Sequence, residues 1–183
     1  MGPLEVVWAV LIGVFAVVGV VRGYPKELGV TTTILAALLL LTKGGESVLL
    51  VLDSFLARYA QGSVVFEGQY SALIQSLFYI LLFVAIVVIS YHGETLAFAG
   101  EAPRGPVGVL LNLMSGLLNG YLISGTIWHY LHAFNYPIQV LGLFRPPLTA
   151  FAQNYLVPLM PVSLLEPYLL FLVPFMIVMR VVR

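Results

Sequence analysis

The stretch Val20–Val30, VVRGYPKELGV, places two cations, an acid, a glycine and a proline between two strongly apolar runs. Such a stretch is compatible with a turn of a soluble protein, with a catalytic loop, or with a connection between two membrane helices. Which of these it is depends on whether the rest of the chain suits water or lipid, and the composition decides that.

The composition indicates a membrane protein. Of the 183 residues, 61% are hydrophobic and only 9% are charged, with a mean hydropathy of +1.04, whereas about 25% of residues are charged in ordinary globular domains. So few charges cannot cover a water-exposed surface, and we predict an all-α integral membrane protein. The formal net charge is zero, which predicts no nucleic-acid partner. The absence of cysteine excludes disulfides and thiol chemistry.

The chain holds five apolar segments, at residues 4–21, 28–42, 71–91, 107–131 and 164–179. A membrane-spanning helix needs about 20 apolar residues, so the first, third and fourth segments are long enough. The second is shorter, at about 22 Å, and the fifth contains Pro174. We predict four to five transmembrane helices. The first segment has no preceding Lys or Arg and no small-residue cleavage pattern, which favours an uncleaved helix over a signal peptide.

The opening stretch is therefore read as the turn of an N-terminal helical hairpin. Gly23 and Pro25 interrupt the first helix, and Glu27 begins the second, where an acid favours the positive helix end. The six residues from Arg22 to Glu27 leave room only for a tight turn, which predicts two antiparallel neighbouring helices. Arg22 and Lys26 either fix the membrane topology or bind lipid headgroups or a partner.

Beyond the second segment, short interfacial helices are expected. The stretch ESVLLVLDSFLARYA, Glu46 to Ala60, has apolar residues at helical spacing and is predicted as a helix on the membrane surface. The alternative is a broken or re-entrant helix continuing through residues 43–45. We divide the chain into a membrane core, residues 1–131, and a proline-rich interfacial tail, residues 132–183. That tail is expected to hold a short surface helix near residues 148–157 and a fifth transmembrane helix.

The fourth segment contains the densest pattern in the chain, GVLLNLMSGLLNGYLISG. Gly108, Asn112, Gly116 and Gly120 stand four residues apart, and Asn119 precedes the last of them. The Gly116–Gly120 pair is a GxxxG motif, which lets a neighbouring helix approach closely. This glycine stripe serves either helix packing, inside the subunit or in a homo-oligomer, or a polar path lined by the two asparagines.

Together, RGYPKE after a first membrane helix and NLMSGLLNGYLISG in a later one resemble the colicin V production protein family. The resemblance covers about residues 4–131 and rests on Arg22, Gly23 and Glu27 in the first motif and on Gly116 and Gly120 in the second. It implies a small multi-pass protein of the bacterial inner membrane, with an N-terminal hairpin and a glycine-repeat helix. It also implies a role in peptide-toxin export and envelope upkeep. Asn119 stands where the family usually carries an arginine.

The sequence contains no complete catalytic or metal-binding pattern, which favours a non-enzymatic protein without a cofactor or metal. His129 and His132 lie near Trp128 and Tyr130 at the end of the fourth segment, which is typical of an interfacial aromatic belt. Two histidines without a nearby carboxylate make an incomplete metal site. No nucleophile triad, phosphate loop or dinucleotide motif is present in the sequence.

Three classes of function remain after these exclusions. The first is an envelope or export protein of the colicin V production type, and the second is an accessory subunit of a larger respiratory or photosynthetic membrane complex. The third is a small transporter or channel. The expected partners are the lipid bilayer and a membrane protein or a second copy of the chain. With five spans, the distribution of basic residues predicts an outside N-terminus and an inside C-terminus.

Overall fold

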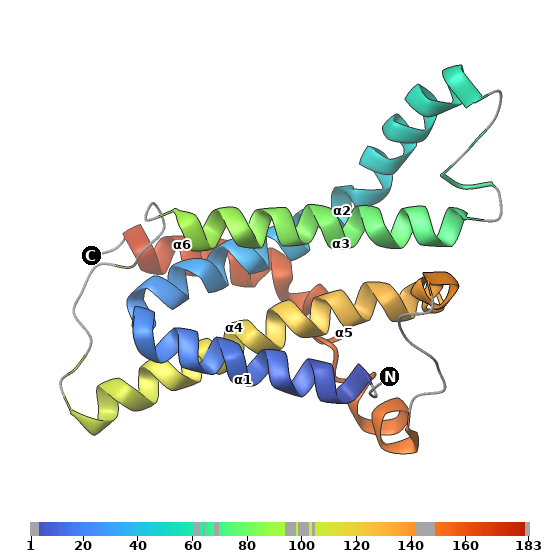
Figure 1. Ribbon diagram of the computed structural model, residues 1–183. Coiled ribbons are helices and arrows are strands. Elements are labelled where there is room, and N and C mark those ends of the chain that lie inside the picture. The colour runs from blue at the N-terminus through green and yellow to red at the C-terminus, as the bar shows by residue number, and fades with distance from the viewer. Residues whose placement is uncertain are drawn as a thin grey trace.

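In the computed structural model the described residues are 4–60, 63, 65–67, 70–93, 98, 103, 105–141 and 149–181 (Figure 1). Four long helices come first: α1 (Leu4–Arg22), α2 (Tyr24–Ala60), α3 (Ser71–His92) and α4 (Pro106–Ala133). Four short helical elements follow: η1 (Pro137–Leu141), η2 (Ala152–Leu156), α5 (Pro161–Leu165) and η3 (Glu166–Tyr168). The last element is α6 (Leu169–Val181).

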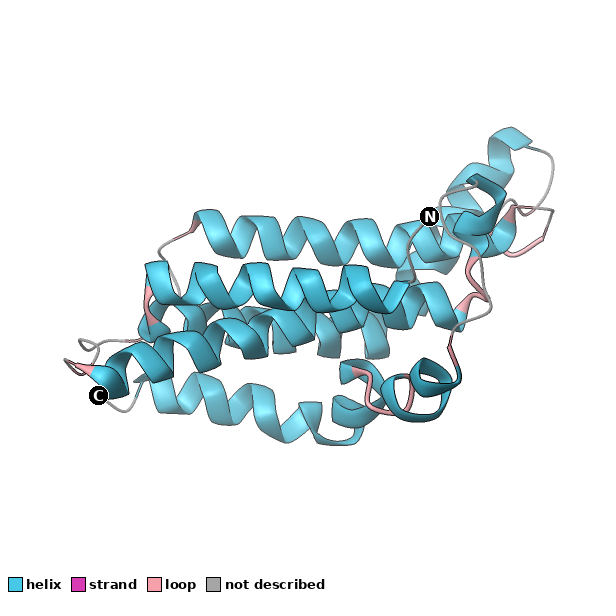
Figure 2. Cartoon of the chain, turned by 60° about the horizontal axis from the view of Figure 1, so that its bottom comes forward, coloured by secondary structure: helices cyan, strands magenta, loops and turns pink. Residues whose placement is uncertain are grey.

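Five helical stretches among the described residues are long and apolar enough to cross a membrane. They are α1, α2, α3, α4 and the stretch Ala152–Val181, of which α6 is the final part. The two termini lie at opposite ends of the bundle in both views (Figure 1, Figure 2). For the described residues, the predicted all-helical fold with four to five helices long and apolar enough to span a membrane is confirmed.

We call the two ends of the bundle the turn end and the proline end. The turn end holds the α1–α2 turn at Gly23, the end of α3, the start of α4 and the end of α6 (Figure 1). The proline end holds the start of α1, the end of α4 and the short elements η1 and η2. Arg22, Lys26 and Arg180 belong to the turn end by their places in these helices. Three further basic residues on which the predicted orientation rests, Arg104, Arg145 and Arg183, lie outside the described residues, so that orientation stays a prediction.

The predicted separation of the second span, residues 28–42, from a surface helix, Glu46 to Ala60, was wrong, because α2 is a single helix of 37 residues. Its length is about 55 Å, so it contains both the predicted short span and the predicted surface helix Glu46–Ala60. Two glycines in a helix cost about 1 kcal/mol each. Gly45 has a packing role instead of a helix-breaking one, because a Cβ atom there would collide with the ring of Tyr79 on α3. The second half of α2 extends away from the bundle (Figure 1).

The predicted hairpin also needs correction. The chain does reverse at Gly23, but α1 packs mainly against α4 and only slightly against α2 (Figure 1). The two helices run antiparallel: Gly19 meets Gly116, Ile12 meets Gly120, and the rings of Trp8 and Trp128 lie 5.8 Å apart. The partner of α1 therefore comes from a distant part of the sequence.

One face of α2 forms the centre of the core. Ile34, Leu38 and Leu41 are fully or almost fully buried, and they pack with residues of α3, α4 and α6. Those partners include Phe83 on α3 and Leu169 on α6. Because α6 contributes to this core, the last helix of the proline-rich tail is an integral part of the bundle.

The tail is helical but interrupted, as its prolines predict. Pro161 opens α5, and Pro174 lies inside α6. The fifth predicted helix, residues 164–179, begins in the structure at Leu169, with η3 and α5 directly before it. Within the predicted surface helix near residues 148–157 the structure has the π-helix η2, Ala152–Leu156, whereas Leu148 lies outside the described residues. Its place at a membrane surface stays a prediction.

Candidate functional site

The turn between α1 and α2 is shorter than predicted. Only Gly23 separates the two helices, and its φ of 88° is a left-handed conformation that favours glycine. The N–H of Gly23 donates to the C=O of Gly19 at 2.9 Å, which closes α1. The N–H of Tyr24 donates to Asn112 Oδ1 on α4 at 2.8 Å. An asparagine of the glycine stripe thus supplies a partner for an N–H at the start of α2, which has no acceptor within its own helix.

The glycine stripe lies at the contact between α4 and α1. A Cβ atom at Gly116 would lie 2.9 Å from the Cα atom of Gly19, and one at Gly120 would lie 2.8 Å from the Cα atom of Ile12. Side chains at these positions would therefore force the two backbones apart. Gly108, the first member of the stripe, instead faces the backbone of Pro103 and takes no part in this contact.

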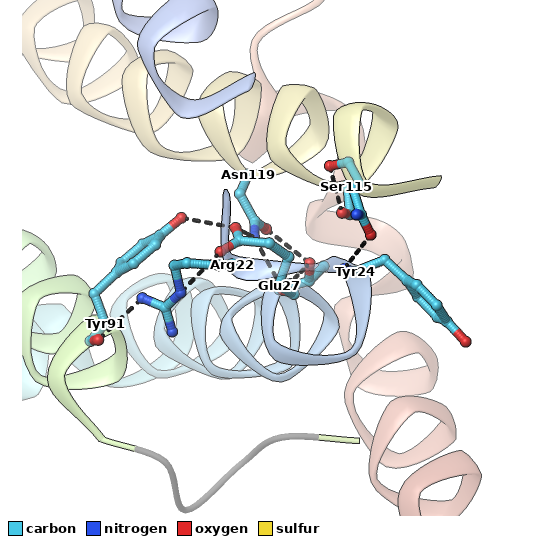
Figure 3. A network of polar contacts seen from close by, with 8 residues as sticks. Arg22, Tyr24, Glu27, Tyr91, Ser115 and Asn119 are labelled. Atoms are coloured by element: carbon cyan, nitrogen blue, oxygen red, sulfur yellow. Dashed lines mark hydrogen bonds and ion pairs between the residues drawn. The ribbon is translucent and has the colours of Figure 1, made fainter. Parts of the chain in front are cut away.

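Next to the glycine contact, Glu27 is completely buried, with 0% of its surface exposed. Its Oε2 atom accepts hydrogen bonds from the Tyr91 hydroxyl at 3.0 Å and from Asn119 Nδ2 at 2.7 Å (Figure 3). A buried carboxylate is costly unless it is paired and hydrogen-bonded. Three helices, α2, α3 and α4, meet at this one carboxylate.

Arg22 supplies the opposite charge. Its Nε lies 3.2 Å from Glu27 Oε1, and its side chain is 22% exposed. Oε1 has no hydrogen bond, so the contact is an ion pair whose N–H does not point at that oxygen. Arg22 Nη1 also donates to the C=O of Tyr91 at 3.0 Å, and the guanidinium carbon lies 4.5 Å from the centre of the Tyr91 ring. Arg22 therefore connects the end of α1 to α2 by an ion pair and to α3 by a hydrogen bond and a cation–π contact.

Asn119 completes the group, which we call the Glu27 cluster: Arg22, Glu27, Thr31, Tyr91 and Asn119. Asn119 is fully buried, and its Nδ2 donates to the C=O of Glu27 at 2.9 Å as well as to the carboxylate. Thr31 Oγ1 lies 2.7 Å from Asn119 Oδ1 and 2.9 Å from the C=O of Glu27, and its single proton serves one of them at a time. Both amide hydrogens of Asn119 are thus engaged, and its amide oxygen accepts from Thr31 whenever that hydroxyl does not donate to the C=O of Glu27.

The structure brings together most of the residues that the sequence singled out, but not all of them. Arg22, Glu27, Asn119, Gly116 and Gly120 lie at the junction of α1, α2 and α4. Lys26 is exposed and stays outside the Glu27 cluster.

Two members of the cluster were missed in the sequence. Thr31 stands four residues after Glu27, a helical spacing that indicates a shared face. Tyr91 had no comparable signal, because only the packing of α3 brings it to Glu27.

At the proline end, the aromatic side chains form a small hydrogen-bonded group. Trp128 Nε1 donates to the Tyr136 hydroxyl at 3.1 Å, and His132 Nδ1 lies 3.0 Å from the same oxygen. Burial raises the pKa of the Tyr136 phenol. His129 Nδ1 lies 3.4 Å from Ser163 Oγ. No group of three metal-ligating side chains occurs among the described residues.

No protein-family model, curated protein sequence or solved structure matches this chain.

Proposed function

We propose that this chain is a non-enzymatic, multi-pass protein of the bacterial inner membrane, of the colicin V production type, that serves envelope maintenance or export. One observation carries the proposal. The two motifs that resemble that family, RGYPKE and NLMSGLLNGYLISG, are about 90 residues apart in sequence and meet at the Glu27 cluster. Glu27 of the first motif accepts a hydrogen bond from Asn119 of the second at 2.7 Å.

The geometry favours helix packing over a polar path for the two asparagines. Asn112 accepts a hydrogen bond from the N–H of Tyr24, and Asn119 is hydrogen-bonded to Glu27 and Thr31. A residue that lines a path must be reachable by the solute, whereas Asn119 is fully buried and both of its amide hydrogens bind Glu27. This supports a protein that acts by assembly and speaks against a transporter.

The outer surfaces of the helices support a role in assembly as well. Val10, Val14 and Val17 on α1 are each more than half exposed, and so are Phe171 and Phe175 on α6. Such surfaces suit lipid tails, a membrane-protein partner or a second copy of the chain.

Deleting the gene and restoring it with tagged variants tests this proposal. We expect the deletion strain to become permeable to a hydrophobic dye and to lose export of the peptide toxin. The wild-type chain should restore both properties. The variant Glu27→Gln should restore neither, and Glu166→Gln, the same change at an exposed carboxylate, should restore both. A deletion strain with an intact envelope and normal export would contradict the proposal.

A second candidate is an accessory subunit of a larger membrane complex, and one feature favours it. The second half of α2, which extends away from the bundle (Figure 1), carries exposed apolar side chains: Val48, Val51, Phe55 and Tyr59. Purification in mild detergent and identification of the proteins that co-migrate distinguishes the two candidates. A respiratory complex that co-migrates with the wild type but not with Phe55→Ser would establish the accessory role.

A further inference from the structure

The first part of α2 is long enough to cross the hydrocarbon core of a bilayer by itself. The segment Tyr24–Lys43 has 20 residues, and a helix of that length spans about 30 Å, the thickness of the core. Lys43 pairs there with Glu166, and both side chains are about half exposed. Exposed charges belong at the headgroups, because hydrocarbon does not solvate them. In a bilayer, residues 46–60, which we call the arm, therefore begin at the headgroup level.

The arm extends away from the bundle (Figure 1), and the α2–α3 connection ties it to the start of α3. Asp53 Oδ1 on the arm accepts hydrogen bonds from the N–H of Val65 at 2.9 Å and from the Ser63 hydroxyl at 3.0 Å. Gln75 Nε2 on α3 donates in turn to the C=O of Val65 at 2.9 Å. Val65 is completely buried. These contacts cover the inner side of the arm and leave its outer side without a partner among the described residues.

The outer side of the arm is amphipathic. Its apolar side chains recur at helical spacing and are 46% to 77% exposed; they form the arm stripe: Val48, Val51, Phe55 and Tyr59. The rings of Phe55 and Tyr59 lie 5.5 Å apart, and aromatic rings are enriched at the level of lipid headgroups. Ser47 and Ser54 are exposed on a neighbouring face of the same helix. One face therefore suits the boundary of the hydrocarbon, and the other suits water.

We propose that the arm lies on the bilayer surface, with the arm stripe in lipid and with Ser47 and Ser54 toward water. This inference rests on the membrane location in the proposed function. An amphipathic helix in this position buries its apolar face about 5–10 Å into the boundary between headgroups and acyl chains. The bilayer is the occupant of the stripe because the arm begins at the headgroup level and diverges from the bundle, so lipid is the apolar phase that adjoins it.

Fluorescence of the chain in phosphatidylcholine vesicles tests the proposal. The chain has no cysteine, so Ser47→Cys, Val51→Cys, Ser54→Cys and Phe55→Cys can each carry one bimane fluorophore. Lipid brominated near the headgroup end of its acyl chains should quench the fluorophore at positions 51 and 55 about threefold more than at 47 and 54, and aqueous iodide should show the reverse order. Equal quenching at all four positions would overturn the proposal. Protection of 51 and 55 from both quenchers would overturn it as well, by indicating contact with protein.

A fifth label separates failure of this inference from failure of the proposed function. Leu81 is 63% exposed on α3, which is long and apolar enough to span a membrane. A bimane at Leu81→Cys should be quenched by lipid brominated deep in its acyl chains, wherever the arm lies. Quenching at 81 together with strong iodide quenching at 55 would overturn the placement of the arm alone. Iodide quenching at both positions would overturn the membrane location and the arm together.

A matched pair of variants shows whether the arm stripe holds the arm on the lipid. With the fluorophore on Tyr59→Cys, the double change Val51→Asn/Phe55→Asn should raise iodide quenching about threefold, because binding of such a helix scales with its buried apolar area. Ser47→Asn/Ser54→Asn introduces the same side chain twice on the polar face and should leave the quenching unchanged. Equal iodide quenching in the two double variants would refute the proposal.

Discussion

Two ion pairs of similar length, both between described residues, lie in very different surroundings. Arg22 and Glu27 lie 3.2 Å apart at the junction of α1 and α2, with 22% and 0% of their side chains exposed. Lys43 and Glu166 lie 3.4 Å apart between α2 and η3, with 53% and 49% exposed. In the first pair, Tyr91 and Asn119 bind the carboxylate as well. Distance alone therefore says little about what an ion pair contributes.

Burial makes both partners of an ion pair necessary for stability. Removing one partner of a buried pair leaves the other uncompensated, whereas water replaces the lost partner of an exposed one. The Glu27 cluster should thus tolerate substitution poorly, and the Lys43–Glu166 pair should tolerate it well. Four substitutions, from the largest expected effect to the smallest, test this contrast.

Glu27→Gln should have the largest effect. The substitution keeps the size of the side chain but leaves the Arg22 guanidinium without its counter-charge. Loss of one partner of a buried pair costs about 3–5 kcal/mol, and the value here should be near the lower limit because water reaches Arg22. The free energy of unfolding in mixtures of dodecyl maltoside and SDS, followed by tryptophan fluorescence, measures the effect. An effect no larger than that of Glu166→Gln would remove the contrast between the two pairs.

Gly116→Leu should follow, with a loss of about 2 kcal/mol or more from overpacking. The new side chain meets the Cα atom of Gly19 and must separate α1 from α4. This separation also pulls Arg22, at the end of α1, away from Glu27. Leu118→Ile is the control, because Leu118 is 43% exposed and lies off the stripe. The same unfolding measurement applies, and wild-type stability of Gly116→Leu would disprove the packing role of the glycine.

Asn119→Ala should cost less, about 0.6 kcal/mol and at most about 1.7 kcal/mol, the range for side-chain hydrogen bonds between membrane helices. The ion pair itself survives in this variant, so the comparison between Glu27→Gln and Asn119→Ala separates the charge from its hydrogen bonds. If Asn119 instead lined a path for a solute, alanine would abolish activity with almost no change in stability. Parallel measurements of unfolding and of dye permeability decide between the two.

Glu166→Gln should have the smallest effect, about 0.5 kcal/mol or less, because exposed pairs contribute little. The effect should also shrink as salt is raised from 10 mM to about 1 M, where screening acts within about 3 Å. Unfolding measurements at both salt concentrations test this. A loss above 2 kcal/mol that is insensitive to salt would show that the Lys43–Glu166 pair acts as a buried pair.

The sequence predicted the apolar helices better than it predicted their partners. Continuous apolar runs give α1, α3 and α4 almost to the residue, since length and hydropathy are local properties. The unbroken course of α2 was missed because Gly44 and Gly45 resemble a break when read alone. Their place in a helix becomes clear only when Tyr79 of α3 is seen against Gly45.

The candidate site was predictable in part for the same reason. The glycine spacing in α4 and the charges around Gly23 were visible as two separate motifs. That they meet depends on α1 packing against α4, and no local pattern in α1 specifies which helix it will choose. The buried state of Glu27 follows from that choice, because Asn119 and Tyr91 come from distant helices. Local patterns therefore indicated the parts of the site and not their assembly.

The contact between α1 and α4 also has a consequence for the order of events during synthesis. Gly19 and Gly116 are about 100 positions apart, and chains grow at about 5–20 residues per second. The first helix therefore waits roughly 5–20 s before its main partner exists. During that interval Arg22 and Glu27 can form their ion pair, since only four residues separate them in the chain. A nascent hairpin can thus neutralise its own charges first and exchange water for Asn119 only when the fourth helix arrives.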